Sequence, residues 1–149
     1  MATMTQIQLS VAQPVIDWLA AHAAAVAAVK AAEIMSVRIN VALVDASGVL
    51  TAFLRMPGAP LHSVEIAIDK AYTAASFGLP TSQWTAALQQ HSPAVREGLV
   101  LRPRFVAFGG GLPIVEHGQR IGGIGVSGAS EQQDEECAKA GLAAIGINA

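Results

Sequence analysis

The stretch Arg120–Glu136, RIGGIGVSGASEQQDEE, contains the pattern G-x-G-x-x-G at Gly123, Gly125 and Gly128. In a dinucleotide-binding fold this glycine turn joins a strand to a helix, and a second parallel strand follows that helix. Residues 129–149 follow the last glycine here, and we expect them to form one closing helix and a short tail. The sequence therefore argues against a dinucleotide site and favours an antiparallel sheet.

An alanine-rich segment predicts a long first helix over residues 9–35. Pro14 lies near its start, where proline is tolerated because the first amides of a helix have no partner within it. The side chains that recur at helical spacing and form its apolar stripe are Val15, Leu19, His22, Val26 and Val29.

The next segment, VRINVALVDASGVLTAFLR (residues 37–55), changes to a strand pattern. Two runs rich in β-branched residues flank the turn residues 46–48, which predicts a β-hairpin. Apolar side chains at positions 61, 64, 68, 71 and 75 then predict a second helix over residues 61–77. Gly78 closes that helix, because glycine readily adopts the left-handed conformation that ends helices.

The remaining part of the chain predicts a short helix, a loop and further strands. Thr81 or Ser82 can cap a short helix that runs to about residue 90, and residues 91–103 have a loop pattern. Short apolar runs alternate with glycine over residues 104–127, which predicts two or three strands, the last two joined at His117–Gly118.

The closing helix begins at Ser130. Ser130 and Gln133 fit a capping box, in which each side chain satisfies the backbone amide of the other residue. Acidic residues fill the first turns, where the helix dipole favours negative charge. The whole order predicts an α+β fold, with an antiparallel sheet of about five strands flanked by helices in a single domain over residues 1–149.

The composition excludes several classes of protein. Of the 149 residues, 52% are hydrophobic and 13% are charged, with a net charge of −2. No basic patch for nucleic acid stands out, and no apolar run is long enough to cross a membrane. We expect the surplus apolar surface to form contacts between subunits. The single cysteine, Cys137, excludes an intrachain disulfide, and the N-terminal sequence lacks a signal-peptide pattern, so we expect a cytoplasmic protein.

Residues 42–81 and 108–145 carry a set of motifs that spans most of the chain. They read V-D-x-x-G, R-M-x-G-A, K-A-x-T-A, G-G-G-L-P-I and G-x-I-G-V-S-G, followed by E-Q-Q-D at residues 131–134. With these motifs the sequence closely resembles the GlcG/HbpS family, the haem-degrading domain family related to the C-terminal domain of PduO-type proteins. Members of the family commonly have E-Q-D at this place, and this sequence has one additional residue, E-Q-Q-D.

The resemblance implies a profilin-like three-layer α/β/α sandwich with a five-stranded antiparallel sheet. It also implies homo-oligomers from dimer to octamer. Characterised members bind haem and some degrade it, whereas others have no settled activity.

The late glycines are the first candidate site. Gly109, Gly110 and Gly111, with those of residues 122–128, remove side chains from one region of the sheet. Such bare backbone either lets a helix pack unusually close or leaves a floor for a flat ligand, and close packing explains most of these glycines. Ser127 leads into a helix N-terminus whose amides can hold a ligand carboxylate.

Lys70 and Arg55 are candidate catalytic or ligand-binding cations. Lys70 has mostly small and apolar neighbours at helical spacing, with Thr73 and Phe77 further along the same helix as candidate ligand contacts. Its ammonium either meets a ligand or partner there or extends to water on its long stem. Arg55 either pairs with Asp45 or Glu65 or clamps a substrate carboxylate or a haem propionate.

Glu131 and Asp134 lie three residues apart and therefore project from one side of the closing helix. Acids at a helix start usually interact with the dipole. In the alternative, one of them pairs with Lys70 or Arg55 and acts as a general base.

His22 is the best candidate for an iron ligand among the four histidines, because neutral imidazole suits iron. A histidine that is satisfied internally or exposed at a rim is the alternative. No two histidines have the spacing of a compact metal site, and Cys137 has no histidine placed by sequence to activate it.

The sequence thus leaves three functions open, and it leaves open whether the protein is an enzyme. The first is haem binding, with or without degradation, although only 5% of the residues are aromatic. The second is a cofactor-independent isomerase, lyase or proton-transfer enzyme for a small organic acid, in a cleft formed by Gly109–Gly111, Lys70, Arg55 and Glu131. The third is an accessory or sensor protein without catalysis.

Overall fold

The hairpin predicted from residues 37–55 forms one half of the sheet. The computed structural model describes residues 3–149. Strands β1 (Asn40–Asp45) and β2 (Leu50–Arg55) pair antiparallel, from Asn40 opposite Arg55 to Val44 opposite Leu50. The carboxylate of Asp45 accepts hydrogen bonds from the amides of Ser47 and Val49 and so fixes the turn between the strands.

Within residues 3–149 the sheet has four strands, not the five that were expected. Strands β3 (Gly111–Glu116) and β4 (Gln119–Ser127) form a second hairpin, and the order is β2-β1-β4-β3 with every pair antiparallel. Residues 105–108, expected as a strand, lie beside α2 instead. The hydroxyl of Thr73 donates to the carbonyl of Arg104 and accepts from the amide of Val106, so this backbone bonds to a helix rather than to the sheet.

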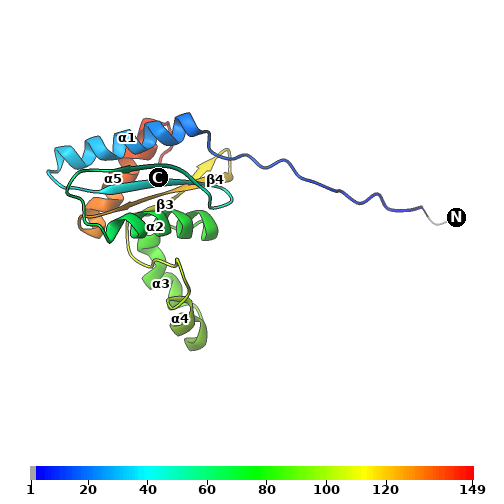
Figure 1. Ribbon diagram of the computed structural model, residues 1–149. Coiled ribbons are helices and arrows are strands. Elements are labelled where there is room, and N and C mark those ends of the chain that lie inside the picture. Colours follow the sequence, from blue (N-terminus) through cyan, green and yellow to red (C-terminus); the bar gives the residue numbers. More distant parts are fainter. Residues whose placement is uncertain (1–2) are drawn as a thin grey trace.

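Helices cover both faces of the sheet, as the predicted α/β/α layers require. Helices α1 (Trp18–Ile34) and α5 (Glu131–Ala144) lie on one face and α2 (Ser63–Phe77) lies on the other (Figure 1). The predicted end of α2 at Gly78 is confirmed by its left-handed conformation, and the predicted capping box at the start of α5 is confirmed by both of its hydrogen bonds.

Helix α1 differs from the expectation in its start and in its buried face. It begins at Trp18, where the Asp17 carboxylate accepts from the amide of Leu19, and residues 3–17 contain no helix. The buried side chains of α1 are Ala21, Ala24, Ala25, Ala28 and Ala32. Small side chains let α1 approach α5 closely, because a methyl group on Gly141 would lie 2.7 Å from the carbonyl oxygen of Ala24. The larger residues Val15, Leu19 and His22 therefore face outward.

Residues 79–103 form short helices that extend away from the sheet on the side of α2 (Figure 1). They are the 3-10 helix η1 (Thr81–Gln83), α3 (Trp84–Leu88) and α4 (Pro93–Leu99). The loop expected over residues 91–103 thus contains α4, because Ser92 caps the amide of Val95 and Pro93 occupies the first turn. Among residues 3–149, no helix has the length and apolar character that spanning a membrane requires.

Glycine removes the side chains that would keep α2 away from the sheet. A methyl group on Gly125 would overlap the carbonyl oxygen of Ala67, and one on Gly123 would overlap that of Ala71. A methyl group on Gly111 would lie 2.6 Å from the carbonyl oxygen of Lys70. The glycines of β3 and β4 therefore serve the close packing of a helix, which is one of the two interpretations of the sequence.

This contact predicts a large cost for a single methyl group. We expect Gly125→Ala to lower the free energy of unfolding by about 1–3 kcal/mol, since the backbone of α2 must move to accommodate it. Gly98→Ala is the matched control, because Gly98 lies in exposed α4 with open space around it. That change should be neutral or stabilising by up to about 1 kcal/mol. Urea unfolding monitored by circular dichroism measures both, and equal effects would contradict the packing argument.

Candidate functional site

Lys70 is enclosed where α2 crosses the ends of β3 and β4. Its side chain is only 1% exposed. The ammonium donates a hydrogen bond to the carbonyl oxygen of Val126 at 2.8 Å and another to Oδ2 of Asp134 at 3.1 Å. The ring of Phe108 covers it, with its centroid 5.0 Å from Nζ. Of the two interpretations of Lys70, the structure supports a buried cation with a partner rather than one that extends to water.

Asp134 is the partner and is itself 2% exposed. One carboxylate oxygen binds Lys70, and the other accepts from the amide of Ala129 at 3.0 Å, just before α5. The sequence suggested that amides at the start of α5 could hold a ligand carboxylate. One of them, that of Ala129, instead binds the carboxylate of Asp134. Because α2 and α5 cover opposite faces of the sheet, the ion pair joins the two helical layers around the end of β4.

Burial shifts the pKa values of both partners in the direction that favours their uncharged forms. Desolvation lowers the pKa of Lys70, and the charges of Asp134 and, less strongly, Glu131 oppose that shift. Desolvation also raises the pKa of Asp134, against the attraction of Lys70 and the hydrogen bond from Ala129. Burying the two charges therefore costs free energy, which their mutual attraction and hydrogen bonds oppose.

The glycine run Gly109–Gly111 packs directly around this ion pair. The amide of Gly109 donates to Glu131 at 3.4 Å, and that of Gly111 donates to the hydroxyl of Thr81 at 2.9 Å. A side chain on Gly110 would lie 2.6 Å from Nζ of Lys70, and the φ angle of +127° at Gly110 also disfavours any residue other than glycine. Thr81 thus binds the glycine loop, and it is not the helix cap that its sequence position indicated.

Several predicted site residues converge here, and others do not. The residues brought together around the ammonium are Lys70, Gly109, Gly110, Gly111, Glu131 and Asp134, with buried Ser127 next to Val126. Thr73 binds the loop at Arg104 and Val106 instead, and Phe77 packs edge-on against Trp84 and Phe105.

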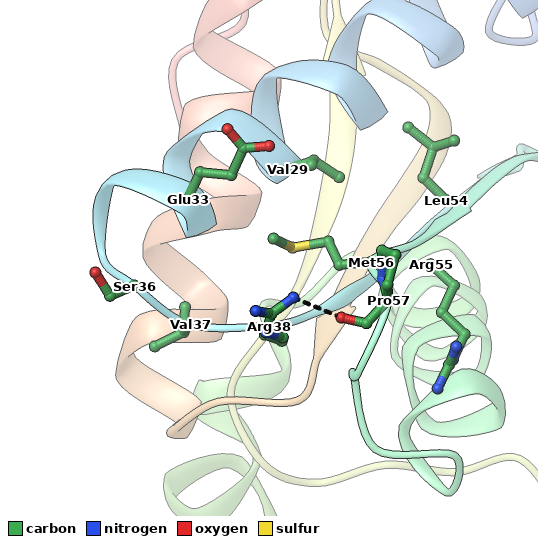
Figure 2. A pocket seen from close by; sticks show the side chains of 9 residues that line it. All are labelled: Val29, Glu33, Ser36, Val37, Arg38, Leu54, Arg55, Met56 and Pro57. Atoms are coloured by element: carbon green, nitrogen blue, oxygen red, sulfur yellow. Dashed lines mark hydrogen bonds between the residues drawn. The ribbon is translucent and has the colours of Figure 1, made fainter.

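Arg55 lies apart from Lys70, at the end of β2. Its guanidinium donates to the carbonyl oxygen of Ala59 at 2.6 Å, and no ion pair to Asp45 or Glu65 occurs among residues 3–149. Arg55 borders a cavity of about 520 Å³ between α1 and the end of β2. Figure 2 shows Glu33 and Arg38 on its walls, with Val29, Leu54 and Met56 lining it.

His22 is exposed on α1, and α1 covers the face of the sheet opposite to α2, the helix that carries Lys70. Its neighbours at helical spacing include Trp18 and Leu19, which are 66% and 57% exposed. The structure therefore places His22 in an exposed apolar surface, and this arrangement corresponds to the rim-exposed alternative. His22 and Lys70 of one chain cannot bind the same small group, because the sheet separates them.

Sequence reasoning missed two contributors to these sites. Phe108 shields Lys70 from water, and only its position before the glycine run could have indicated this. Trp18 lies four residues before His22, so the helical spacing could have revealed it. Cys137 is fully buried, and burial raises the pKa of its thiol to about 11, as expected for a packed cysteine. No group of three potential metal-ligating side chains converges within residues 3–149.

Comparisons with known proteins identify the family of the chain. Residues 16–143 match the family model described as haem degrading protein HbpS-like. The corrinoid adenosyltransferase PduO of Citrobacter freundii is 37% identical over 121 residues, which cover 81% of this chain and 36% of that protein. The chain thus spans about a third of the length of this curated relative.

Two solved structures have the same fold over nearly the whole chain. The Klebsiella pneumoniae protein ORFY aligns with a TM-score of 0.87 at 30% identity, covering 97% of this chain and all of that one. A structure described as a PduOC:heme complex aligns with a TM-score of 0.80 at 35% identity, covering 87% of this chain and 94% of that one.

The buried ion pair predicts an asymmetric response to mutation. We expect Lys70→Met alone to cost about 3–5 kcal/mol of unfolding free energy, because it leaves the Asp134 carboxylate buried without its partner. The double variant Lys70→Met, Asp134→Leu should cost far less, since both buried charges are removed. Urea unfolding of the two variants checks this, and a double variant less stable than the single one would contradict it.

The pH dependence of stability gives a second test of the same pair. Because burial raises the pKa of Asp134 above its ordinary value of 3.8, the native state binds its proton more tightly than the unfolded chain does. Above pH 3.8 and up to the raised pKa, this group therefore lowers the free energy of unfolding as pH rises. The stability of the double variant relative to the wild type should increase over that range. A difference that stays flat or decreases would show that the pKa of Asp134 is not raised.

Proposed function

The chain belongs to the HbpS-like family of haem-degrading proteins, and from this premise we propose that it binds haem, with His22 as the iron ligand. The observation that carries the proposal is the position of His22 in an exposed apolar face of α1. Histidine is a common protein ligand of haem iron, and apolar side chains beside it would pack against the porphyrin. The similarity to a relative solved as a haem complex supports the same class of ligand.

The residues around His22 fit one face of a porphyrin. Trp18 and Leu19 precede His22 on the same side of α1, Val15 lies just before the helix, and all three are half-exposed or more. A flat aromatic ring such as that of Trp18 gives the large apolar contact that a porphyrin requires. When bound, haem would supply an iron centre that exchanges electrons and binds small ligands. The protein residues would hold and orient it.

The propionates of the haem need a cation, and the two candidates differ in availability. The ammonium of Lys70 is enclosed and already bound to Asp134 and Val126. The guanidinium of Arg55 is exposed and has the fork geometry that pairs with carboxylates. We therefore favour Arg55 over Lys70 for this role, supplied by another subunit, because Leu54 faces α1 and its neighbour Arg55 projects from the other face of the sheet.

A second copy of the chain would complete the site. One helix face covers only one side of a porphyrin, and a deep haem pocket excludes water on both sides. The outer face of α1 is also too apolar to remain in water without cost. We propose a homo-oligomer, between a dimer and an octamer, in which another subunit covers this face.

Proton-transfer chemistry on a small organic acid is the second candidate function. The pKa shifts of Lys70 and Asp134 favour it, because shifts toward neutrality are typical of acid–base residues. Substrate access would require the half-exposed ring of Phe108 to move. The two candidates are separable, since only haem binding depends on His22.

Titration with hemin tests the first candidate. We expect a Soret band with the wild type, and a loss of at least tenfold in affinity with His22→Ala, or about 1.4 kcal/mol. His91→Ala is the control, because His91 is exposed between α3 and α4, in the segment that extends from the sheet on the side of α2. The stable Lys70→Met, Asp134→Leu variant should retain the band. Equal binding by His22→Ala would refute His22 as the ligand.

Trp18→Ser tests the apolar contact separately from the iron ligand. We expect weaker hemin binding by about 1–2 kcal/mol, the value of a partly buried aromatic side chain, with the Soret maximum unchanged. An unchanged maximum means that the axial ligand is still in place. Absorbance titration measures both quantities, and a shifted maximum would contradict a purely apolar role for Trp18.

A further inference from the structure

Residues 3–15 form an extended arm that leads away from the rest of the chain (Figure 1). Its large apolar side chains Met4, Ile7, Leu9 and Val11 are between 75% and 94% exposed. Such exposure is costly, because each of these side chains normally contributes to a core. The arm is therefore an apolar segment that lacks a contact surface in its own subunit.

The arm has the pattern of a strand. Over residues 6–11, QIQLSV, polar and apolar side chains alternate strictly, so that Ile7, Leu9 and Val11 would lie on one side of an extended chain. This period of two is typical of a strand that buries one face. The arm also lacks the backbone partners that a strand needs.

The two outer edges of the sheet differ in their capacity to accept another strand. At β3, the carbonyl of Gly110 accepts from β4, so Gly111 and Pro113 direct their backbone groups outward. The amide of Gly111 is already bound by Thr81, and Pro113 has no amide hydrogen. The edge at β3 is thus blocked in the way that natural sheets protect their edges.

The edge at β2 is open over its second half, beyond the register shift in its pairing with β1 between Leu43 and Val44. The amide of Met56 donates to the carbonyl of Ile39 beyond the end of β1, so the alternation turns the backbone groups of Phe53 and Arg55 outward. Within the described chain these groups have no hydrogen-bond partner across that edge. The strand sequence LTAFLR contains neither proline nor lysine. An open edge of this kind readily pairs with another strand.

An apolar recess lies beside the same edge. The cavity of about 520 Å³ between α1 and the end of β2 is lined in part by Val29, Leu54 and Met56 (Figure 2). Leu54 projects from β2 toward the core on the side of α1. A strand added to β2 would therefore direct alternate side chains toward this recess.

We propose that residues 6–11 of a second copy of the chain add a fifth strand at β2, with Ile7, Leu9 and Val11 facing the recess beside α1. The arm is assigned to a second copy because its root is fixed away from its own β2. The amide of Ile16 donates to the carbonyl of Ile121 at the start of β4, and β1 lies between β4 and β2. From that root the arm points away from the body (Figure 1).

Amide hydrogen exchange on the full chain tests the added strand. We expect slow exchange at Phe53 and Arg55 in the wild type, and at least tenfold faster exchange at these two amides in the triple variant Ile7→Ser, Leu9→Ser, Val11→Ser. The amides of Ala52 and Leu54, which face β1, should stay protected in both. The control Gln6→Ser, Gln8→Ser changes the opposite side of the strand and should keep the wild-type protection. Fast exchange at both outward amides in the wild type would overturn the proposal.

Cross-linking distinguishes exchange between copies from a return to the same chain. Two chains are prepared separately, one with Gln8→Cys and one with Thr51→Cys, and are mixed with a short bis-maleimide; Cys137 is fully buried and does not compete. We expect a cross-linked dimer of the two variants, reduced at least tenfold when the first chain also carries Ile7→Ser and Leu9→Ser. No dimer above the level of that control would overturn the exchange between copies. Haem binding is not measured in either experiment, so their failure leaves the haem proposal intact.

Discussion

The close approach of α2 to the hairpin of β3 and β4 determines most of this structure. Gly111, Gly123 and Gly125 leave bare backbone on one face of the sheet, and the backbone of α2 occupies the space that their side chains would fill. A helix held at this distance cannot turn its sheet-facing side chains to water. Lys70, with its long stem, is therefore enclosed, and its charge must be compensated inside the protein.

The compensation comes from the opposite helical layer. Asp134 projects from the first turn of α5 and binds both Lys70 and the amide that precedes that turn. The ion pair thus fixes α2 and α5 to the same end of β4. The carbonyl of Val126 and the ring of Phe108 complete the surroundings of the ammonium. The ion pair is therefore a buried structural contact between two helices. A buried ion pair of this kind fixes the relative positions of the two helices more than it adds to the free energy of unfolding.

Local patterns predicted the elements whose ends have strong chemical signals. The first hairpin, the end of α2 at Gly78 and the capping box of α5 could all be predicted, because each depends on residues close in sequence. The fifth strand could not be predicted correctly: Thr73, more than thirty residues upstream, binds the backbone around Arg104 and Val106. The sequence left open which acid, Glu131 or Asp134, pairs with which cation. It could not select Lys70 with Asp134, because these residues are 64 positions apart and meet only in the folded chain.

The error in α1 has a physical origin that also bears on function. Spacing identified Val15, Leu19 and His22 as one stripe, but hydrophobicity alone does not determine which stripe is buried. Alanine occupies the buried positions of α1 because α5 approaches so closely at Gly141 that larger side chains would not fit. The residues excluded from that interface must then face outward, and they form an apolar surface around a histidine. The distribution of residues on α1 thus has two results. Its small residues allow tight packing against α5, and its larger apolar residues form an exposed face.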